Sequence, residues 1–367
     1  MGSNSRRNLV GMDRRELEQL AAERGQPAYR GRQIYTAIYA RGARSFDELT
    51  DLPGSFREAL AQHYIIAYPE IKGRIASRDG SLRYLLSLED GARVETVYMP
   101  EDNRATLCLS SQAGCAVDCR FCFTALLGLE RNLTPGEMAG QALAVIADQH
   151  PKSRLNVVLM GMGEPLLNLK AVMKAVRLLA DPRGMGISLR RITVSTAGIV
   201  PKIAEFGREA VRPKLAISLN ASTEEQRTAL MPINRKYSLQ QLLKACRAYP
   251  LRPREQLTFE YVMMEGINDS DDDAARVADL LCGIRAKVNL IPYNGGPALP
   301  YRPPSLDRVL AFQKVLSDKE IPAFIRISRG QDIMAACGQL RLASSAEPNR
   351  QTLPTTPQQC VATPECQ

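Results

Sequence analysis

Three cysteines within eight residues are the sharpest chemical feature of the chain, in the segment Cys115-Ala-Val-Asp-Cys119-Arg-Phe-Cys122. The segment follows a predicted strand and is expected to be a loop, which can turn all three sulfurs toward one centre. Thiolates are soft ligands that suit iron–sulfur clusters and zinc. A structural zinc site takes four ligands, and no fourth Cys or His stands at a usual spacing. The spacing therefore predicts a 4Fe-4S cluster on three thiolates, with one iron open to another ligand.

A family resemblance rests on these cysteines and on a second segment. Cys-x3-Cys-x2-Cys with Phe121 before the last Cys resembles the radical S-adenosylmethionine superfamily, whose open iron binds the amine and carboxylate of S-adenosylmethionine. Gly161-Met162-Gly163-Glu164-Pro165 follows the next predicted strand, as the glycine–glutamate motif of that superfamily does. By itself this segment is weak evidence, because a tight turn after a strand explains its glycines equally well.

A closer resemblance extends in order from the N-terminal helices to about Leu340. It is to the bacterial RNA adenine-C2 methyltransferases that act on both ribosomal and transfer RNA. The resemblance implies methylation at C2 of an adenosine in the peptidyl-transferase loop of 23S rRNA, and at C2 of the adenosine 3′ of the anticodon in tRNAs. The segments that carry it are Val94–Tyr98, Leu107–Ser110, Gly161–Asn168, Ile192–Gly198, Ala216–Ala221, Leu230–Asn234, Glu260–Met263 and Ala335–Leu340.

The same resemblance assigns catalytic roles to three residues. Adenine C2 is electrophilic and carries no acidic proton, so a polar methyl transfer has no nucleophile and a radical route is required. By position, Cys337 carries the methyl group as S-methylcysteine and forms a covalent bond to the RNA. Glu95 accepts the C2 proton, and Cys108 releases the product and ends in a transient disulfide with Cys337. Apart from the resemblance, Cys108 reads equally as a buried free Cys in an apolar strand, and Glu95 as an exposed strand residue.

The resemblance also implies two molecules of S-adenosylmethionine per turnover and an electron donor such as flavodoxin or ferredoxin. Its cofactor contacts fall near the carboxyl ends of the predicted strands, where α/β sheets place ligands. The chain departs from the family pattern at three positions: Asn220 replaces a His, Gln331 an acidic residue and Ile327 a basic one. The cofactor-binding residues carried over are Gly163, Glu164, Ser195, Ser218, Leu219, Asn220 and Asn294.

Strand–helix alternation must position these residues. Six strand–helix units follow one another in the sequence, which predicts an α/β fold with parallel strands. The family resemblance implies that this fold is a partial (β/α)6 barrel over residues 105–343. A seventh apolar stretch, 323–327, is expected to be an edge strand. The predicted strands are 105–109, 156–160, 191–195, 215–219, 258–263 and 288–291, and three of the predicted helices are 135–149, 169–179 and 271–281.

Two smaller regions precede the barrel and a tail follows it. Residues 1–66 read as short helices, the first capped by Asp13 with Glu16 in a capping box, and are expected to form an RNA-binding accessory domain. Residues 67–104 alternate apolar and polar residues around two Asp-Gly turns, which predicts a small β-hairpin extension carrying Glu95. Residues 344–367 are rich in Pro, Thr, Gln and Ser and are expected to be disordered.

The charge balance points to an anionic partner. Lys and Arg total 48 against 39 Asp and Glu, which gives a net charge of +9. Such an excess of positive charge is common in proteins that bind nucleic acid. Five arginines and no acid lie between Arg24 and Arg44, interleaved with tyrosines. That run predicts either RNA contact or a solvated helix face, and the tyrosines favour RNA slightly.

No apolar run is long enough to span a bilayer, and the first residues lack an apolar signal region. We therefore expect a cytoplasmic protein that does not bind membranes. We also expect it to be a monomer. Three alternatives stay open from the sequence: methylation at adenine C8, as in the related antibiotic-resistance methyltransferase; a radical enzyme acting on protein or small molecules; and a non-catalytic iron–sulfur protein that binds RNA.

Overall fold

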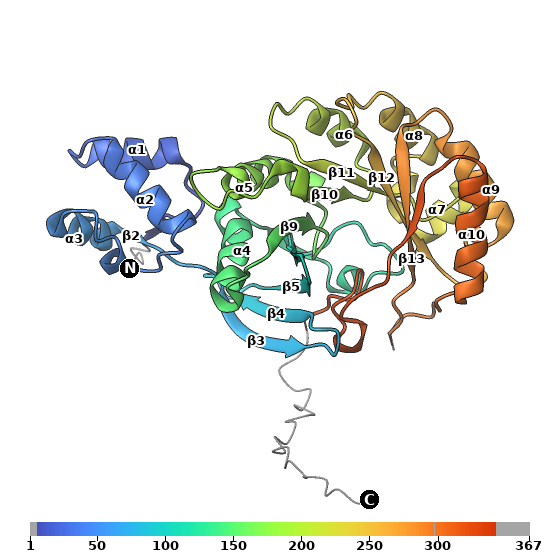
Figure 1. Ribbon diagram of the computed structural model, residues 1–367, viewed down its shortest axis with the longest axis horizontal. Coiled ribbons are helices and arrows are strands. Elements are labelled where there is room, and N and C mark those ends of the chain that lie inside the picture. The colour runs from blue at the N-terminus through green and yellow to red at the C-terminus, as the bar shows by residue number, and fades with distance from the viewer. Residues whose placement is uncertain (1–5, 297, 343–367) are drawn as a thin grey trace, which may run out of the picture.

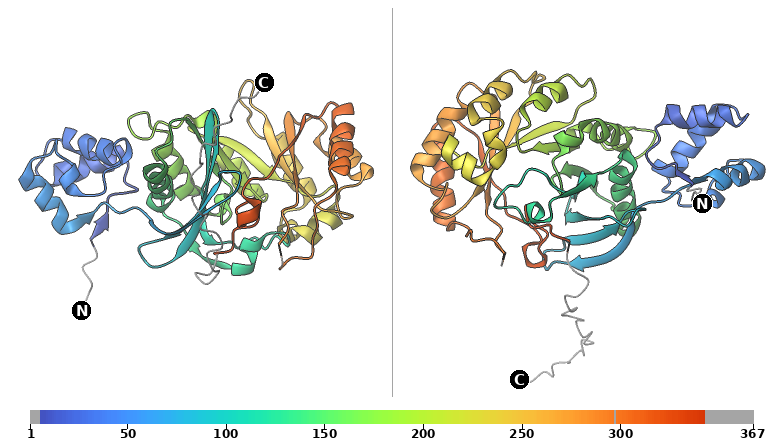
Figure 2. Two further views of the ribbon diagram at one scale, coloured as in Figure 1. Left: turned by 60° about the horizontal axis from the view of Figure 1, so that its bottom comes forward. Right: turned by 180° about the vertical axis from the view of Figure 1, so that it is seen from behind.

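The computed structural model describes residues 6–296 and 298–342. Its centre is a ten-stranded sheet in the order β14-β13-β12-β11-β10-β9-β6-β5-β4-β3. The seven strands from β14 to β6 are parallel and form a curved, open half-barrel (Figures 1 and 2). The parallel α/β prediction is confirmed, and β14 lies at the edge as expected. The parallel strands are β6 (Arg104–Cys108), β9 (Arg154–Leu159), β10 (Ile192–Thr196), β11 (Lys214–Ser218), β12 (Leu257–Met263), β13 (Ala286–Pro292) and β14 (Ala323–Ile325).

Seven helices alternate with these strands and lie on the outside of the curved sheet (Figure 1). Several begin at a side-chain cap that the sequence supplies, for example Thr134 before α4 and Ser270 before α9. The six predicted barrel strands agree with the structure to within two residues at each end. The helices are α4 (Pro135–Gln149), α5 (Leu169–Ala180), α6 (Val200–Gly207), α7 (Glu224–Leu230), α8 (Leu239–Arg247), α9 (Asp271–Leu281) and α10 (Leu306–Asp318).

The predicted hairpin extension is a three-stranded antiparallel unit rather than a separate hairpin. Strands β3 (Glu70–Ala76), β4 (Leu82–Ser87) and β5 (Arg93–Glu101) pair in sequence, and β5 then pairs antiparallel with β6. Backbone hydrogen bonds therefore run without a break from the extension into the barrel. This continuity places residues of β5 directly beside the first barrel strand.

The N-terminal region contains helices α1 (Arg14–Glu23), α2 (Tyr29–Tyr39) and α3 (Gly54–His63), with a short pair of strands, β1 (Arg7–Asn8) and β2 (Tyr64–Ile65). Asp13 and Glu16 form the expected capping box. The helices surround a hydrophobic core of their own, which also takes in Leu143 of α4 and Leu178 of α5. The division of the chain at residues 66, 104 and 343 stays a prediction, and the expected tail of 344–367 lies outside the described residues.

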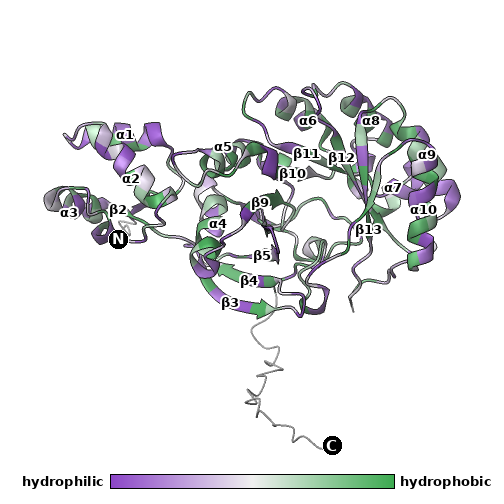
Figure 3. Cartoon of the chain, in the orientation of Figure 1, coloured by the Kyte–Doolittle hydropathy of each residue, from purple (hydrophilic) through white to green (hydrophobic). Residues whose placement is uncertain are grey.

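The main core lies between the barrel sheet and its outer helices. Figure 3 shows hydrophobic residues along the central strands and hydrophilic ones gathered on the outward helices. On β12, Leu257, Phe259 and Tyr261 point into this core, so the alternate residues of that strand face the inside of the barrel. None of the helices in the described part of the chain is long and apolar enough to cross a membrane.

Candidate active site

A cavity of about 160 Å³ lies inside the barrel toward the carboxyl ends of the strands. It is built from the loop after β6, the ends of β10 and β11, the inner face of β12 and β13, and a segment after β14. Parallel sheets place ligands at this end because the loops there converge from neighbouring strands. The residues lining it include Cys115, Cys119, Cys122, Met160, Gly163, Glu164, Ser195, Ser218, Asn220, Glu260, Val262, Ile291 and Cys337.

The three motif cysteines lie on one loop that is anchored by apolar neighbours. Val117 and Phe121 are buried in a small cluster with Met231 and Tyr293. All three cysteines pack against this cluster and stay partly accessible. Burial raises the pKa of all three thiols, that of Cys115 to about 11. A metal ligand must be deprotonated, so binding of a cation has to displace the protons of these thiols.

The donor set fits an iron–sulfur cluster, since three thiolates from one loop reach one cavity. Within residues 6–296 and 298–342, no group of three or more His, Cys, Asp or Glu side chains is arranged to hold a metal ion. A cluster carries its thiolates on separate irons, so its ligands need not crowd around one point. The assignment of Cys115, Cys119 and Cys122 as cluster ligands stays our prediction.

The turn after β9 is fixed in a shape that requires glycine. Gly163 has φ +100°, and a Cβ there would lie 2.5 Å from Cβ of Gln112. The Gln112 side chain in turn accepts a hydrogen bond of 2.8 Å from the Glu164 N–H. The Glu164 carboxylate accepts from the N–H groups of Leu166 and Ala197 at 2.9 and 2.7 Å, and burial raises its pKa to about 7. Glu164 therefore ties the turn to the end of β10 while facing the cavity.

The other predicted cofactor contacts divide into two groups. Ser195 and Ser218 line the cavity from β10 and β11, as does Asn220. Leu219 and Asn294 are buried, and among the described residues they do not belong to the lining. The Leu219 N–H donates to the carbonyl of Glu260, and Nδ2 of Asn294 donates to the carbonyl of Cys337 at 3.2 Å. These two residues shape the cavity wall in this structure.

The departures from the family pattern have local explanations at two positions. Asn220 has φ +55°, a left-handed conformation that Asn tolerates better than most residues. Its Oδ1 accepts from the Val262 N–H at 2.8 Å, so its side chain is occupied by the backbone. Nε2 of Gln331 donates to Oδ1 of Asn294 at 2.7 Å, which turns the Asn294 amide NH₂ toward Cys337. Ile327 is 89% exposed and touches neither group.

The segment bearing Cys337 is held at both ends. At one end, the Gly330 N–H donates to Oδ2 of Asp79 in the β3–β4 turn at 2.8 Å. At the other, the Phe123 N–H of the cysteine loop donates to the carbonyl of Gly338 at 2.7 Å. Cys337 lies between these anchors, solvent-accessible but crowded by protein atoms, and this crowding raises its pKa to about 11.

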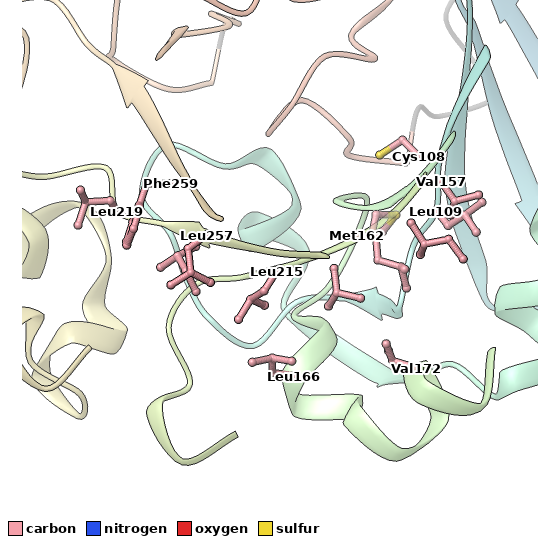
Figure 4. Close-up of a cluster of buried hydrophobic side chains, with 14 of the residues drawn as sticks. Cys108, Leu109, Val157, Met162, Leu166, Val172, Leu215, Leu219, Leu257 and Phe259 are labelled. Carbon is pink, nitrogen blue, oxygen red and sulfur yellow. The ribbon is translucent and has the colours of Figure 1, made fainter. Parts of the chain in front are cut away.

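Cys108 lies behind Cys337, at the end of β6. Figure 4 shows its side chain beside Leu109 and Val157 in the hydrophobic cluster. Burial raises the pKa of Cys108, and the nearby Cys337 thiol raises it further, so the two sulfurs lie within electrostatic reach of each other. Both are free thiols in the structure. The predicted disulfide between them stays a prediction.

Glu95 is not the exposed strand residue that the alternative interpretation describes. It is 1% exposed, and its carboxylate lies 3.6 Å from the guanidinium of Arg83, which is itself buried. The same carboxylate accepts from the Arg341 N–H at 3.0 Å, and Arg83 donates to the carbonyl of Met334. Within the described residues Glu95 does not line the cavity; it lies under the two ends of the segment that carries Cys337.

Two buried charged residues of the site were missed by the sequence analysis. Glu260 lines the cavity from β12, where a single acid in an apolar strand was the available signal. Arg227 of α7 is fully buried and donates to the carbonyls of Ala197, Ser218 and Leu219. Arg227 thereby joins the ends of β10 and β11 beneath the cavity, and no pattern in the sequence distinguishes it from a surface arginine.

The variant Arg227→Met is expected to lose at least about 3 kcal/mol of unfolding free energy. Methionine fills a similar volume but leaves three buried carbonyls with no donor from this position, at roughly 1–3 kcal/mol each. Urea unfolding of the purified protein measures the loss. Arg235→Met, at an exposed position on the following 3₁₀ helix (Pro232–Arg235), is the control and should unfold like the wild type. Equal midpoints for the two variants would contradict the structural role of Arg227.

Comparison with known proteins assigns the family. Residues 109–278 match the radical SAM superfamily, and residues 7–66 match the ribosomal RNA large subunit methyltransferase N-terminal domain. The chain is 52% identical over 336 residues to the probable dual-specificity RNA methyltransferase RlmN of Koribacter versatilis, covering 86% of this chain and 96% of that one. The chain belongs to the radical SAM family of dual-specificity RNA methyltransferases.

Other members of this family of methyltransferases are also similar to this chain over most of their length. The RlmN protein of Paracoccus denitrificans is 47% identical over 362 residues, with 94% of this chain and 92% of that one covered. A crystal structure of a radical SAM methyltransferase from Sphaerobacter thermophilus superposes with a TM-score of 0.87 at 43% identity, covering 91% of this chain and 99% of that one. The cofactors of the family are a 4Fe-4S cluster and S-adenosylmethionine, which agrees with the cofactor prediction.

Proposed function

We propose that this chain methylates adenosine C2 in both ribosomal and transfer RNA, at the peptidyl-transferase loop of 23S rRNA and at the adenosine 3′ of the anticodon in tRNAs. The relatives named as dual-specificity RNA methyltransferases support the two RNA classes. The observation that carries the proposal is the shared cavity: Cys337 and the three motif cysteines line one space, with Cys108 close behind. A plain RNA-binding iron–sulfur protein has no use for two further thiols at that place.

Cys337, Glu95 and Cys108 then each have one role in the reaction. When bound, the cluster and two molecules of S-adenosylmethionine per turnover supply a methyl group and a 5′-deoxyadenosyl radical. Cys337 receives the methyl group on Sγ, and that carbon loses one hydrogen atom to the 5′-deoxyadenosyl radical and bonds to adenine C2. The resulting adduct is a radical, and it would give up one electron to the bound cluster. Glu95 accepts the proton from C2. The Cys108 thiolate attacks Sγ of Cys337, the bond from Sγ to the new carbon breaks, and that carbon takes up a proton to become the methyl group. The disulfide so formed is reset by an external thiol reductant.

The acid–base task of Glu95 requires a change at the Cys337 segment. Glu95 is held by Arg83 and by the backbone of Arg341 in the structure. For its carboxylate to reach adenine, the segment between Met334 and Arg341 must move off it once RNA is bound. The segment is held by hydrogen bonds from Phe123, Thr124 and Gln339 and by the buried side chains of Ala335 and Leu340, all of which this movement would have to release.

The remaining partners follow from this chemistry. The cluster needs an electron donor of the flavodoxin or ferredoxin type, and RNA is the macromolecular substrate. We propose that the chain works as a monomer in the cytoplasm, where its RNA substrates are made.

The arginines of the N-terminal region differ in how free they are to bind RNA. Arg41 forms a two-bonded pair with Asp51, and Arg32 pairs with Glu18. Arg24 and Arg44 form no salt bridge with any residue that the structure describes, and they stack on the rings of Tyr64 and Tyr68 at 5.3 and 5.4 Å. The stacked pair is the better candidate for phosphate contact.

The double variant Arg24→Gln, Arg44→Gln is expected to bind RNA more weakly and to reduce the slope of log K against log salt by about 2, roughly one for each lost phosphate contact. Filter binding across a salt series measures the slope. Arg41→Gln is the matched control, since Asp51 already neutralises that charge, and its slope should stay close to the wild-type value. An unchanged slope in the double variant would mean that these two arginines are solvated and do not contact RNA phosphates.

Nucleoside mass spectrometry on RNA from a gene-deletion strain tests the proposed function. Digested 23S rRNA and tRNA from the strain should lack 2-methyladenosine, and both should regain it when the gene is restored. Loss of 8-methyladenosine instead would support the C8 alternative, and loss from only one RNA class would restrict the substrate. Unchanged methylation of both RNAs would contradict the proposal.

A further inference from the structure

One buried carboxylate at the cavity has no role in the proposed reaction. Glu260 occupies the middle of β12, between Phe259 and Tyr261, which point outward into the core. The alternation of the strand turns Glu260 inward, where it lines the cavity and is 9% exposed. Burying a carboxylate costs free energy unless its charge is compensated, so its presence on an otherwise apolar strand calls for a chemical reason.

Neighbouring groups stabilise only one of the two carboxylate oxygens of Glu260 by a hydrogen bond. Asn289, its partner on β13 in the strand register, donates from Nδ2 to Oε1 of Glu260 at 2.9 Å. Lys287 of β13 and Arg326 beyond β14 act at longer range to lower the pKa of Glu260, which burial raises. No residue in the described part of the chain donates a hydrogen bond to Oε2. The carboxylate is therefore held in place with one oxygen left to act as an acceptor.

Cys337 faces the same cavity as this carboxylate. The two side chains line this cavity together, Glu260 from β12 and Cys337 from the segment after β14. Burial raises the pKa of the Cys337 thiol, the charges of Glu260 and Cys122 raise it further, and Arg326 lowers it. A thiol must lose its proton to become a good nucleophile, and a filled cavity leaves little water to take that proton.

We propose that Glu260 accepts the thiol proton of Cys337 as the Cys337 sulfur takes up its methyl group. The S–H bond of Cys337 breaks and its proton moves to Oε2 of Glu260. A bond forms from Sγ to the methyl carbon, and the bond from that carbon to the sulfonium sulfur of S-adenosylmethionine breaks, leaving its electron pair on S-adenosylhomocysteine. No oxidant or reductant is needed. The inference rests on the proposed function, because it takes Cys337 to be the methyl acceptor.

Glu260→Gln tests this step, since Gln keeps the shape of the side chain and can still accept from Asn289. Methyl transfer to Cys337 in the anaerobically reconstituted protein, followed by mass spectrometry of the Cys337 peptide, should slow at least about 100-fold, as expected for loss of a general base. Alkylation of Cys337 by iodoacetamide without S-adenosylmethionine should not slow, because loss of the neighbouring negative charge favours the thiolate and bulk water takes the proton.

Two further variants complete the test. Glu260→Asp retains a carboxylate and should recover part of the methylation rate. Glu265→Gln makes the same change at an exposed position just after β12 and should leave both rates unchanged. Wild-type methylation in Glu260→Gln would overturn the inference, as would an equal fall in methylation and alkylation, which would mean that Glu260 only positions the Cys337 segment. An unmethylated Cys337 in the wild type would overturn the proposed function itself.

Discussion

Cells that produce the Cys108→Ala variant are expected to accumulate the protein covalently joined to RNA through Cys337. This variant keeps the methyl acceptor and keeps the carbon that bonds to adenine. It lacks the thiol that releases the product, and a group that acts after bond formation leaves the intermediate standing when it is lost. Cys108 is buried at the end of β6, so alanine removes one sulfur atom without exposing the strand. Purification, nuclease digestion and intact-protein mass spectrometry would show the retained nucleotide.

Cys337→Ala is the matched variant, and it should fail at the earlier step. It has no methyl acceptor, so it should be unmethylated and carry no nucleotide. Cys337 is solvent-accessible, so this change should cost little stability. Nucleotide mass on Cys337→Ala but not on Cys108→Ala would mean that the two roles are exchanged. Absence of nucleotide from both variants would argue against any covalent intermediate.

Replacing any one of Cys115, Cys119 or Cys122 with Ala is expected to abolish cluster binding and all methylation. The wild-type protein, reconstituted without oxygen, should hold about four irons with the visible absorption of an iron–sulfur cluster. With only two thiolates left, the cluster loses an anchoring iron ligand. Iron and sulfide analysis of the purified variants measures this loss.

Cys282→Ala is the control for the cluster ligands, because Cys282 is an exposed thiol at the end of α9, away from the cavity. It should retain the wild-type iron content. Stoichiometric zinc in place of iron in the wild type would contradict the cluster assignment, and full iron content in any of the three motif variants would remove that cysteine from the ligand set.

The elements of the barrel were predictable because each carries its own local signal. The apolar runs at β9 to β13 and the Gly163 turn depend on residues close in sequence, as does the capping box at Asp13 in the N-terminal region. The cysteine loop was predictable for the same reason, since all three thiols come from eight residues. Ser195 and Ser218 were expected from the family resemblance alone, and both line the cavity.

The features that could not be predicted from the sequence depend on contacts between segments that are distant in the chain. The burial of Glu95 against Arg83 and Arg341 requires that β4, β5 and the chain after β14 meet. Nothing in the sequence around Arg227 distinguishes it from a surface arginine. Only the folded chain shows that three strand-end carbonyls surround its guanidinium. Glu260 gave a faint signal as an acid in an apolar strand, but the pairing of β12 with β13 was needed to place Asn289 beside it.

We propose that the new carbon reaches adenine through the methyl group of Cys337, which first loses a hydrogen, and not by intact methyl transfer from S-adenosylmethionine. Reaction of the purified, reconstituted enzyme with RNA and methyl-deuterated S-adenosylmethionine tests it most directly. Because one hydrogen leaves the Cys337 methyl group before the carbon bonds to adenine, the methyl group on 2-methyladenosine should retain two deuteriums, and 5′-deoxyadenosine should carry the third. A methyl group transferred intact, with all three deuteriums, would contradict the account.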